Sequence, residues 1–498
     1  MCPRPCSGSA GVSEMWWFLA CSLGTFPQVD CSDNSSCRSA FGWGWTCNGE
    51  GLCDEVTVQE RCTTEPEDLF RNRDTYSDAI VLGSVYDRNA FPLEALSIQL
   101  AVSQANQQLG LDNRDYGLVS CDSFEDADYD DLDQETANVE MATWLADEVG
   151  VPAIVGPATS GRTEAAFLAV EPFGTMMISP SATSPALTAL DGLSPTDEQP
   201  GLLWRTAPPD DLQGLAIAQD MALPERARGT VAVVYQAGSY GEGLATVFLD
   251  ATDLDTDAIE FSSDNARDAA VAAVASGDYA EVLFISSERS DFVAFLVGAA
   301  AAGGFEGDDP CRNVAKKNYV PVPGGVCIFL PDGAYDDSIL EEAASASSLF
   351  HQIRGSRPAS ADPEDDVFKL FKTAFASAYN EDATGSGFTA YAYDAAWLAI
   401  YGTAWSLFQT GEITGTGVAK GLRQVSREGV DEEDAIYVQA LSWPTVRATF
   451  EAGDDIDVRG ASGQLDFDPS TEETSAPIEI WKVTDAGDGF EAVYEVQP

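Results

Sequence analysis

Two apolar runs, each followed by a small polar loop, give the clearest structural signal in this chain. Residues 151–155 are apolar and lead through Gly156 into the loop 157–161, after which a helical segment begins. Residues 176–178 form the second run, which ends in the hydroxyl-rich loop 179–184. Two parallel strands joined by one helix would have this pattern, and open α/β sheets bind ligands at the loops beyond the carboxyl ends of their strands. We therefore expect both loops to open onto one crevice.

The same alternation of short apolar runs and amphipathic segments continues along the chain and predicts an α/β protein. No run approaches the ~18 apolar residues that a membrane-spanning helix needs, and we expect the bland stretch 294–304 to be a buried helix. The predicted strands are 230–235, 280–286 and 326–330, and the helices between them are 211–222, 241–253, 265–277 and 290–303.

The two loops after the apolar runs carry groups that suit an anion. They offer backbone N–H groups, helix N-termini and the hydroxyls of Thr159, Ser160, Ser181 and Thr183. Such donors at a helix N-terminus would bind a carboxylate.

The charge of the chain excludes whole classes of partner. There are 82 acidic and 26 basic residues, a formal net charge of -56. Nucleic acid and anionic membrane surfaces would be repelled, so neither is expected as a partner. Calcium binding is the alternative use of the acidic run 126–133, but this run lacks the glycine of an EF-hand loop and has Ala137 at its twelfth position. We expect a solvating acidic surface instead.

Cysteine usage indicates an exported protein. Eleven cysteines are present, and the five in the Gly-, Ser- and Trp-rich stretch 31–74 have neither a nearby histidine nor the paired spacing of a zinc ribbon. Disulfides explain them better, and the prediction extends to a bridge between Cys311 and Cys327 around a Lys-, Pro- and Gly-rich loop. The five are Cys31, Cys37, Cys47, Cys53 and Cys62.

The N-terminal 30 residues read as a leader or tether. The segment MWWFLAC ends in Cys21 after a small residue, as in a bacterial lipoprotein cleavage site, although its apolar run is short. Lipidation of Cys21 with loss of Cys2 and Cys6 would leave 11 − 3 = 8 cysteines, an even number for bridges. Alternatively, the start is misassigned or Cys21 is another disulfide partner.

No enzymatic function is expected. His351 is the sole histidine, and neither Gly-x-Ser-x-Gly nor His-Glu-x-x-His occurs. The segment 415–421 (GTGVAKG) has the wrong spacing for a dinucleotide loop and is predicted to start a helix. We expect neither a cofactor nor a metal.

The chain resembles the type I periplasmic binding proteins, in particular the branched-chain amino acid (Leu/Ile/Val) binding family of ABC transporter substrate-binding proteins. The resemblance covers about residue 80 to the C-terminus, and the order of its segments is more specific than any one of them. The segments are 80–107, the two loops within 151–188, LWRTAPPDDLQG (203–214), VAVVYQAGSYGEGLA (231–245), 388–407 and GASGQLDFDPST (460–471).

This resemblance implies two Rossmann-like lobes with parallel sheets, joined by hinge crossovers and preceded by the small Cys-rich segment. The expected division is a leader over 1–30, the Cys-rich disulfide segment over 31–74, lobe one over 80–206 plus 354–439, and lobe two over 207–353 plus 440–498.

The resemblance also implies a ligand site. Ser160 and Thr183 would bind the α-carboxylate of an amino acid, while the carbonyl of Ser181 and the hydroxyl of Thr183 would face its ammonium group. Tyr240 would close over the ligand, and Asp332 would supply an acidic ammonium ligand. Each of these side chains could instead be a solvated loop hydroxyl or a surface acid.

Two loops depart from the family pattern. Residues 286–291 (SSERSD) lack the aromatic residue often found there and offer Glu288 and Arg289, and residues 84–89 (SVYDRN) are not glycine-rich. A polar or acidic ligand is therefore as compatible with the sequence as a branched aliphatic one.

The resulting functional hypothesis is an extracytoplasmic solute-binding protein, periplasmic or at the cell surface. It would capture a small amino acid or related carboxylate between its lobes and deliver it to an ABC transporter permease, touching the membrane only through the lipid anchor. The alternatives are a ligand-sensing receptor module of the same fold that feeds a signalling partner, and a secreted structural or adhesive protein.

If Cys21 carries lipid, Cys21→Ser should release the protein from the membrane fraction and leave ligand binding intact. Fractionation followed by immunoblotting measures the first effect. Unchanged fractionation would remove the lipid anchor from this account.

Overall fold

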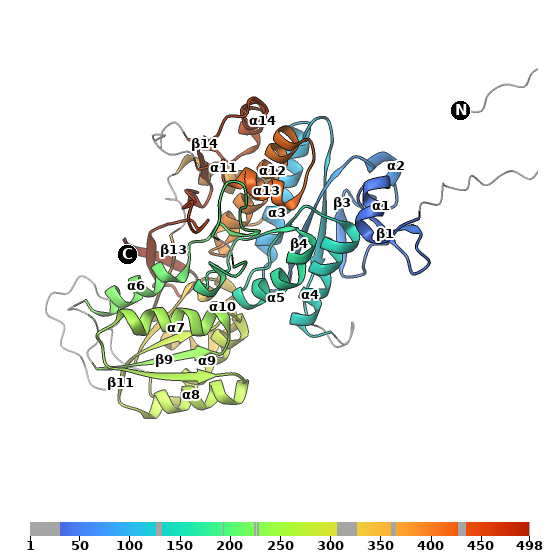
Figure 1. Ribbon diagram of the computed structural model, residues 1–498. Helices are drawn as coiled ribbons and strands as arrows, with labels where there is room; N and C mark the ends of the chain where they lie inside the picture. Colours follow the sequence, from blue (N-terminus) through green and yellow to red (C-terminus); the bar gives the residue numbers. More distant parts are fainter. Residues whose placement is uncertain are drawn as a thin grey trace, which may run out of the picture.

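The computed structural model describes residues 30–125, 132–192, 194–223, 226, 229–305, 326–359, 365–426 and 435–497. They form two α/β lobes, each with its own sheet, and a small disulfide-bonded segment beside lobe one (Figure 1). The predicted α/β class is confirmed. Within these ranges, no helix is both long and apolar enough to cross a membrane. Cys21, the acidic residues 126–131 and Cys311 lie outside the described residues.

Lobe one is built on a six-stranded sheet in which only one edge strand is antiparallel. The central strands β4 and β5 are buried along their whole length, because helices cover both faces of the sheet. In spatial order the strands are β3 (Cys62–Glu65, antiparallel to β5), β5 (Tyr116–Asp122), β4 (Ile80–Tyr86), β6 (Ala153–Val155), β7 (Met176–Ser179) and β8 (Leu203–Arg205).

The helices of lobe one surround α12, which is apolar on nearly every side and packs against α3, α13 and α14. The helix α12 spans Thr389–Thr410. The other elements cover the sheet or connect its strands, and they are α3 (Pro92–Gln107), α4 (Gln134–Thr143), η1 (Trp144–Val149), α5 (Ser160–Val170), η2 (Glu171–Phe173), η3 (Pro185–Leu187), α11 (Asp366–Tyr379), η6 (Ala383–Gly385) and α13 (Gly415–Leu422).

Residues 435–467 pack on lobe one, whereas the predicted division gave 440–498 to lobe two. The segment contains β14 (Ile436–Tyr437), η8 (Ala440–Ser442), α14 (Trp443–Ala452), β15 (Val458–Gly460) and β16 (Gly463–Gln464). The reason is the apolar face of α14, where Trp443 is fully buried and stacks on Tyr401 of α12 at 5.7 Å between ring centroids. After this segment the chain returns to lobe two, where it forms only the last two strands of the sheet.

Lobe two has a seven-stranded sheet with five parallel strands and an antiparallel hairpin at one edge. In spatial order these are β10 (Thr256–Phe261), β9 (Thr230–Gln236), β11 (Tyr279–Ile285), β12 (Cys327–Leu330), β13 (Ile353–Pro358), β17 (Ile478–Val483) and β18 (Phe490–Val496). Its helices are α6 (Asp210–Met221), α7 (Ser239–Ala251), α8 (Asp264–Ser276), α9 (Arg289–Ala302), η4 (Asp332–Ala334), α10 (Asp337–Glu342) and η5 (Ala344–Gln352). β13 therefore belongs to lobe two, although lobe one was expected to resume at 354.

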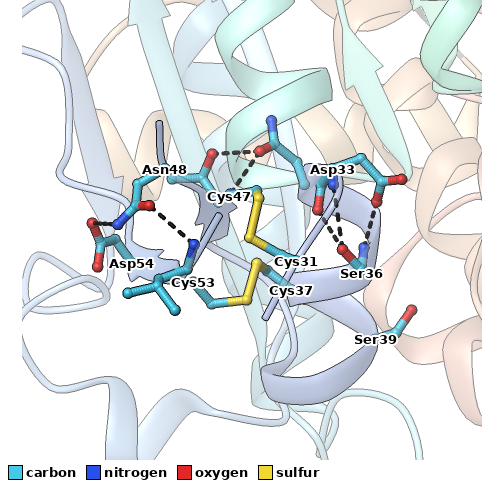
Figure 2. The surroundings of a disulfide bond; sticks show 12 residues. Cys31, Asp33, Ser36, Cys37, Ser39, Cys47, Asn48, Cys53 and Asp54 are labelled. Carbon is cyan, nitrogen blue, oxygen red and sulfur yellow. Dashed lines mark hydrogen bonds between the residues drawn. A yellow bond between two sulfur atoms is a disulfide. The ribbon is translucent and has the colours of Figure 1, made fainter. Parts of the chain in front are cut away.

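The Cys-rich segment folds on the edge of lobe one. It comprises α1 (Asn34–Phe41), β1 (Trp45–Cys47), β2 (Cys53–Glu55) and α2 (Arg73–Tyr76). Figure 2 shows its two disulfides side by side, Cys31–Cys47 and Cys37–Cys53. A third disulfide ties Cys62 of β3 to Cys121 of β5, so this part of the segment is a strand of the lobe-one sheet.

The predicted disulfides are confirmed for all five cysteines of the 31–74 stretch. The sulfurs of Cys31, Cys37 and Cys47 lie within 4.8 Å of one another, but each is in a disulfide and offers no thiolate to a metal. Cys327 is also disulfide-bonded. Its pairing with Cys311 stays a prediction.

Four buried charged side chains hold α6 to the lobe-two sheet. Arg354 of β13 donates from Nε to Asp220 Oδ2 of α6 at 2.8 Å and contacts Glu281 of β11, while Arg226 also bonds Asp220. Burial alone would raise the pKa of Asp220, but Arg354 and Arg226 hold it below its ordinary value. The two cations and two acids therefore compensate one another within the protein interior.

Replacing Arg354 with alanine should destabilise the fold strongly, because Asp220 and Glu281 would remain buried without their shared cation. Loss of one partner of a buried ion pair typically costs about 3–5 kcal/mol of unfolding free energy. Urea unfolding of Arg354→Ala measures it. The control is Arg71→Ala, whose pair with Glu67 is largely exposed, so that its change should stay within about 1 kcal/mol. Similar small losses in both variants would show that the buried network contributes little.

Candidate functional site

A cavity lies between the two lobes, and small-molecule sites are often found at such domain interfaces. Lobe one contributes the loops after β6 and β7, and lobe two the loops after β9, β11 and β12, so carboxyl ends of parallel strands meet across it. The lining residues are Ala90, Phe91, Ala158, Thr159, Ser160, Ser181, Tyr240, Ser287, Glu288, Arg289, Asp332, Gly333, Tyr335, Asp336, Ser386 and Phe388.

The lobe-one wall is the start of α5, and it favours an anion. Ser160 opens this helix, is 2% exposed and accepts a hydrogen bond on Oγ from the Ser184 N–H at 3.1 Å. Ser181 donates its hydroxyl to the Ala158 carbonyl at 2.8 Å. The first turn of α5 carries no acidic residue of its own, and the N-terminus of a helix has a partial positive charge.

The turn that brings this wall close depends on Gly156. Its φ is +102°, and a Cβ there would lie 2.6 Å from the Val85 carbonyl oxygen and 2.6 Å from the ring of Tyr86. Only glycine combines this backbone conformation with that close approach. The strand end at Gly156 noted in the sequence is thus a steric requirement.

The lobe-two wall carries a buried carboxyl group. Tyr240, in the first turn of α7, donates its hydroxyl to Oδ1 of Asp332 in η4, and the two side chains are 6% and 4% exposed. Burial raises the pKa of Asp332, and hydrogen bonds from Tyr240 and Gln213 oppose that rise. A carboxylate held in this way attracts a cation.

The structure brings Ser160, Ser181, Tyr240 and Asp332 together around the cavity, and it places Thr183 differently. Thr183 is fully buried and is not among the lining residues. Its hydroxyl faces the carboxyl group of Asp210 at the start of α6, a residue that sequence reasoning missed. Asp210 stands in the crossover segment 203–214, and the Asp-Asp pair after two prolines was the available signal.

Three aromatic lining residues were also missed because they come from separate segments. Phe91 precedes α3, Tyr335 follows η4 and Phe388 precedes α12. The loop 286–291 indeed supplies no aromatic residue to the cavity, as the sequence indicated. Its Arg289 instead donates to Ser338 Oγ at 2.8 Å and to the Asn89 carbonyl at 3.0 Å.

The lobes touch on both sides of the cavity. Arg162 of α5 forms an ion pair with Glu288 at 2.7 Å, and Ser184 donates its hydroxyl to the Ser239 carbonyl at 2.7 Å. Arg289 crosses to lobe one through Asn89. These contacts join the two lobes directly beside the cavity.

Comparison with known proteins agrees with this geometry. Residues 93–292 match the model of the receptor family ligand binding region. The chemotactic signal transduction system substrate-binding protein BasB of Halobacterium salinarum is 27% identical over 403 residues, which is 78% of this chain and 82% of that protein.

Two solved structures share the fold. One is the branched-chain amino acid transporter substrate binding protein LivJ of Streptococcus pneumoniae in complex with isoleucine, with a TM-score of 0.60, 21% identity and coverage of 84% of this chain and 100% of that one. The other is a leucine binding protein, LivK, of Thermotoga maritima, with a TM-score of 0.62, 17% identity and coverage of 84% and 99%. The resemblance inferred from the sequence is confirmed at the level of the fold: the chain has the type I periplasmic binding protein fold, and its residues 93–292 match the receptor family ligand binding region.

Proposed function

We propose that this protein is an extracytoplasmic solute-binding protein that captures a small amino-acid-like ligand between its lobes. One observation carries the proposal: the cavity has an anion-favouring helix N-terminus on one wall and a buried carboxyl group on the other. A zwitterion fits this polarity and a simple carboxylate or a simple amine fits only half of it.

The ligand would lie with its carboxylate at the first turn of α5, where Ser160 and the backbone N–H groups donate. Its ammonium group would point to Asp332, which Tyr240 orients. A helix N-terminus carries the equivalent of about +0.5 charge, so both ends of the ligand gain electrostatically in the closed cavity. Thr183, which lies behind the wall, would act through Asp210 and not by direct contact.

The remainder of the ligand would face Phe91, Tyr335 and Phe388. These rings give an apolar surface, while Arg289 and Asp336 add polar atoms beside it. The arrangement suits a medium-sized side chain with apolar character. It does not require a branched aliphatic one.

The protein would work outside the cytoplasm, since three disulfides among the described residues indicate an oxidising compartment. The chain enters lobe one from the disulfide-bonded segment (Figure 1). A tether there would hold lobe one and leave lobe two free to move on the crossovers, which is how hinged binding proteins close.

The partner would be an ABC transporter permease, to which the closed form delivers its ligand. A second candidate is a membrane signal transducer, and it is favoured by the match to the chemotactic BasB protein over 78% of this chain. Deletion of the gene separates them: loss of ligand uptake supports the permease, while loss of taxis with unchanged uptake supports the transducer.

Asp332→Asn should weaken amino acid binding much more than binding of the matching des-amino acids, because it removes the charge opposite the ammonium group. A hydrogen bond to a charged group is typically worth about 1.5–3 kcal/mol, or roughly tenfold to a hundredfold in affinity. Titration calorimetry with a ligand found by a thermal-shift screen measures both. Asp253→Asn, an exposed acid of lobe two, is the matched control. Equal affinity of Asp332→Asn and the parent would sink the amino-acid assignment.

Ser160→Ala should weaken amino acids and des-amino acids alike, because it removes a donor to the carboxylate that both share. The expected loss is again roughly tenfold. Ser35→Ala, in the Cys-rich segment, controls for a hydroxyl deletion far from the cavity. A loss confined to the amino acids would place the carboxylate elsewhere.

A further inference from the structure

A second buried carboxyl group, that of Asp210 at the start of α6, lies near enough to Asp332 for their charges to interact. We propose that Asp210 and Asp332 hold one proton between them, which leaves the site with a single negative charge matched to one ammonium group. The inference rests on the proposed function where it places the ammonium at Asp332. It adds the residue and the charge state that would make the site select a ligand with one cationic group.

The geometry of α6 puts the two acids together. Asp210 and Gln213 are one turn apart on the same face of this helix, and the Gln213 amide reaches Asp332. Gln213 Nε2 also donates to Ser356 Oγ of β13 at 3.0 Å, which fixes the amide against the lobe-two sheet. The backbone N–H of Asp210 donates to the Thr183 carbonyl at 2.8 Å, so Asp210 is anchored from lobe one as well.

Asp210 is fully buried, and among the described residues neither of its carboxyl oxygens has a hydrogen-bond partner of standard geometry. The hydroxyl of Thr183 faces it and has no other partner there. Burial, followed by the nearby charge of Asp332, raises the pKa of Asp210 well above its ordinary value. Two ionised carboxylates that are buried close to each other cost free energy through desolvation and mutual repulsion. One proton retained on the pair removes that repulsion.

In the part of the chain that the structure describes, neither Asp210 nor Asp332 forms an ion pair. The charge of Arg205 of β8 lowers the pKa of Asp210, but its guanidinium group is bound to Glu473 through Nε at 2.9 Å and to the Ser184 carbonyl at 2.7 Å. The dipole of α6 favours an ionised Asp210 at the start of the helix. This stabilisation is small compared with the cost of burying a charged carboxylate near a second negative charge.

The other titratable groups around the pair come from each element packed against it. Asp211 of α6 adds a further negative charge near Asp210. Tyr240 of α7 donates a hydrogen bond to Asp332. Tyr391 of α12 lies close enough for the charge of Asp332 to raise its pKa. Burial raises the pKa of both tyrosines, so they stay neutral and supply no compensating charge. The proton must therefore come from solvent and sit on the pair.

The sign of the pH dependence follows from where the proton is held. The native pair keeps a proton that the unfolded chain releases above its ordinary Asp pKa of 3.8. Stability contributed by the pair is therefore greatest at low pH and falls as pH rises above that value, by up to tenfold per pH unit in the unfolding equilibrium constant. Asp210→Asn, which is neutral at every pH, should show a smaller fall, the part that the buried Asp332 alone contributes.

The test is urea unfolding, without ligand, of the parent, Asp210→Asn and Asp332→Asn from pH 4 to pH 8. The ratio of unfolding constants, parent over Asp210→Asn, should rise with pH by up to tenfold per unit. Asp332→Asn removes the like charge but leaves Asp210 buried, so its curve should lie between the two. Asp211→Asn, an exposed neighbour on the same helix, should run parallel to the parent. Glu94 and Asp394, whose pKa values burial raises to about 7, are present in all variants and cancel in the ratios.

If the unfolding constants of the parent and Asp210→Asn change with pH in the same way, the proposal is overturned, because Asp210 would then carry no extra proton. A parallel course of parent and Asp332→Asn would also overturn it, because the proton would belong to Asp210 alone. The second comparison still decides if Asp210→Asn fails to fold. Since no ligand is present, these outcomes are independent of calorimetry on Asp332→Asn, which tests the proposed function by affinity.

Discussion

Parallel strands cannot be joined by tight turns, and this constraint organises the whole molecule. Each strand must be followed by a crossover, usually a helix, so all loops after the strands gather at one edge of the sheet. Two such sheets, one per lobe, face each other through those edges, and the cavity lies between them. The helix N-termini of α5 and α7 point to the same space for the same reason. The polarity of the site is thus a consequence of the backbone topology, and side chains such as Asp332 refine it.

Much of this could be predicted from sequence because the signals are local. The apolar runs at 151–155 and 176–178 became β6 and β7, and their loops supply Ser160 and Ser181 to the cavity. Tyr240 and Asp332 were found through the resemblance of their segments, and they meet as a hydrogen-bonded pair. What each residue does to a ligand stays a proposal.

The remainder depends on long-range packing that no local pattern encodes. Phe91 and Phe388 reach the cavity from helices almost 300 residues apart in the chain. Asp210 comes near Asp332 only when α6 packs on the lobe-two sheet. The return of residues 435–467 to lobe one follows from the burial of Trp443 against α12. The sequence-based division placed this helix in lobe two, because an amphipathic pattern does not identify the lobe against which a helix packs.

The central claim is that the cavity recognises both charges of a zwitterion. The most direct measurement is calorimetry of the parent protein with three matched compounds: an amino acid that raises the melting temperature, its des-amino acid and its decarboxylated amine. The account predicts that the amino acid binds at least tenfold more tightly than either relative, since each relative leaves one wall unpaired. Equal affinity of the amino acid and its des-amino analogue would contradict it, because the lobe-two wall would then contribute nothing to recognition.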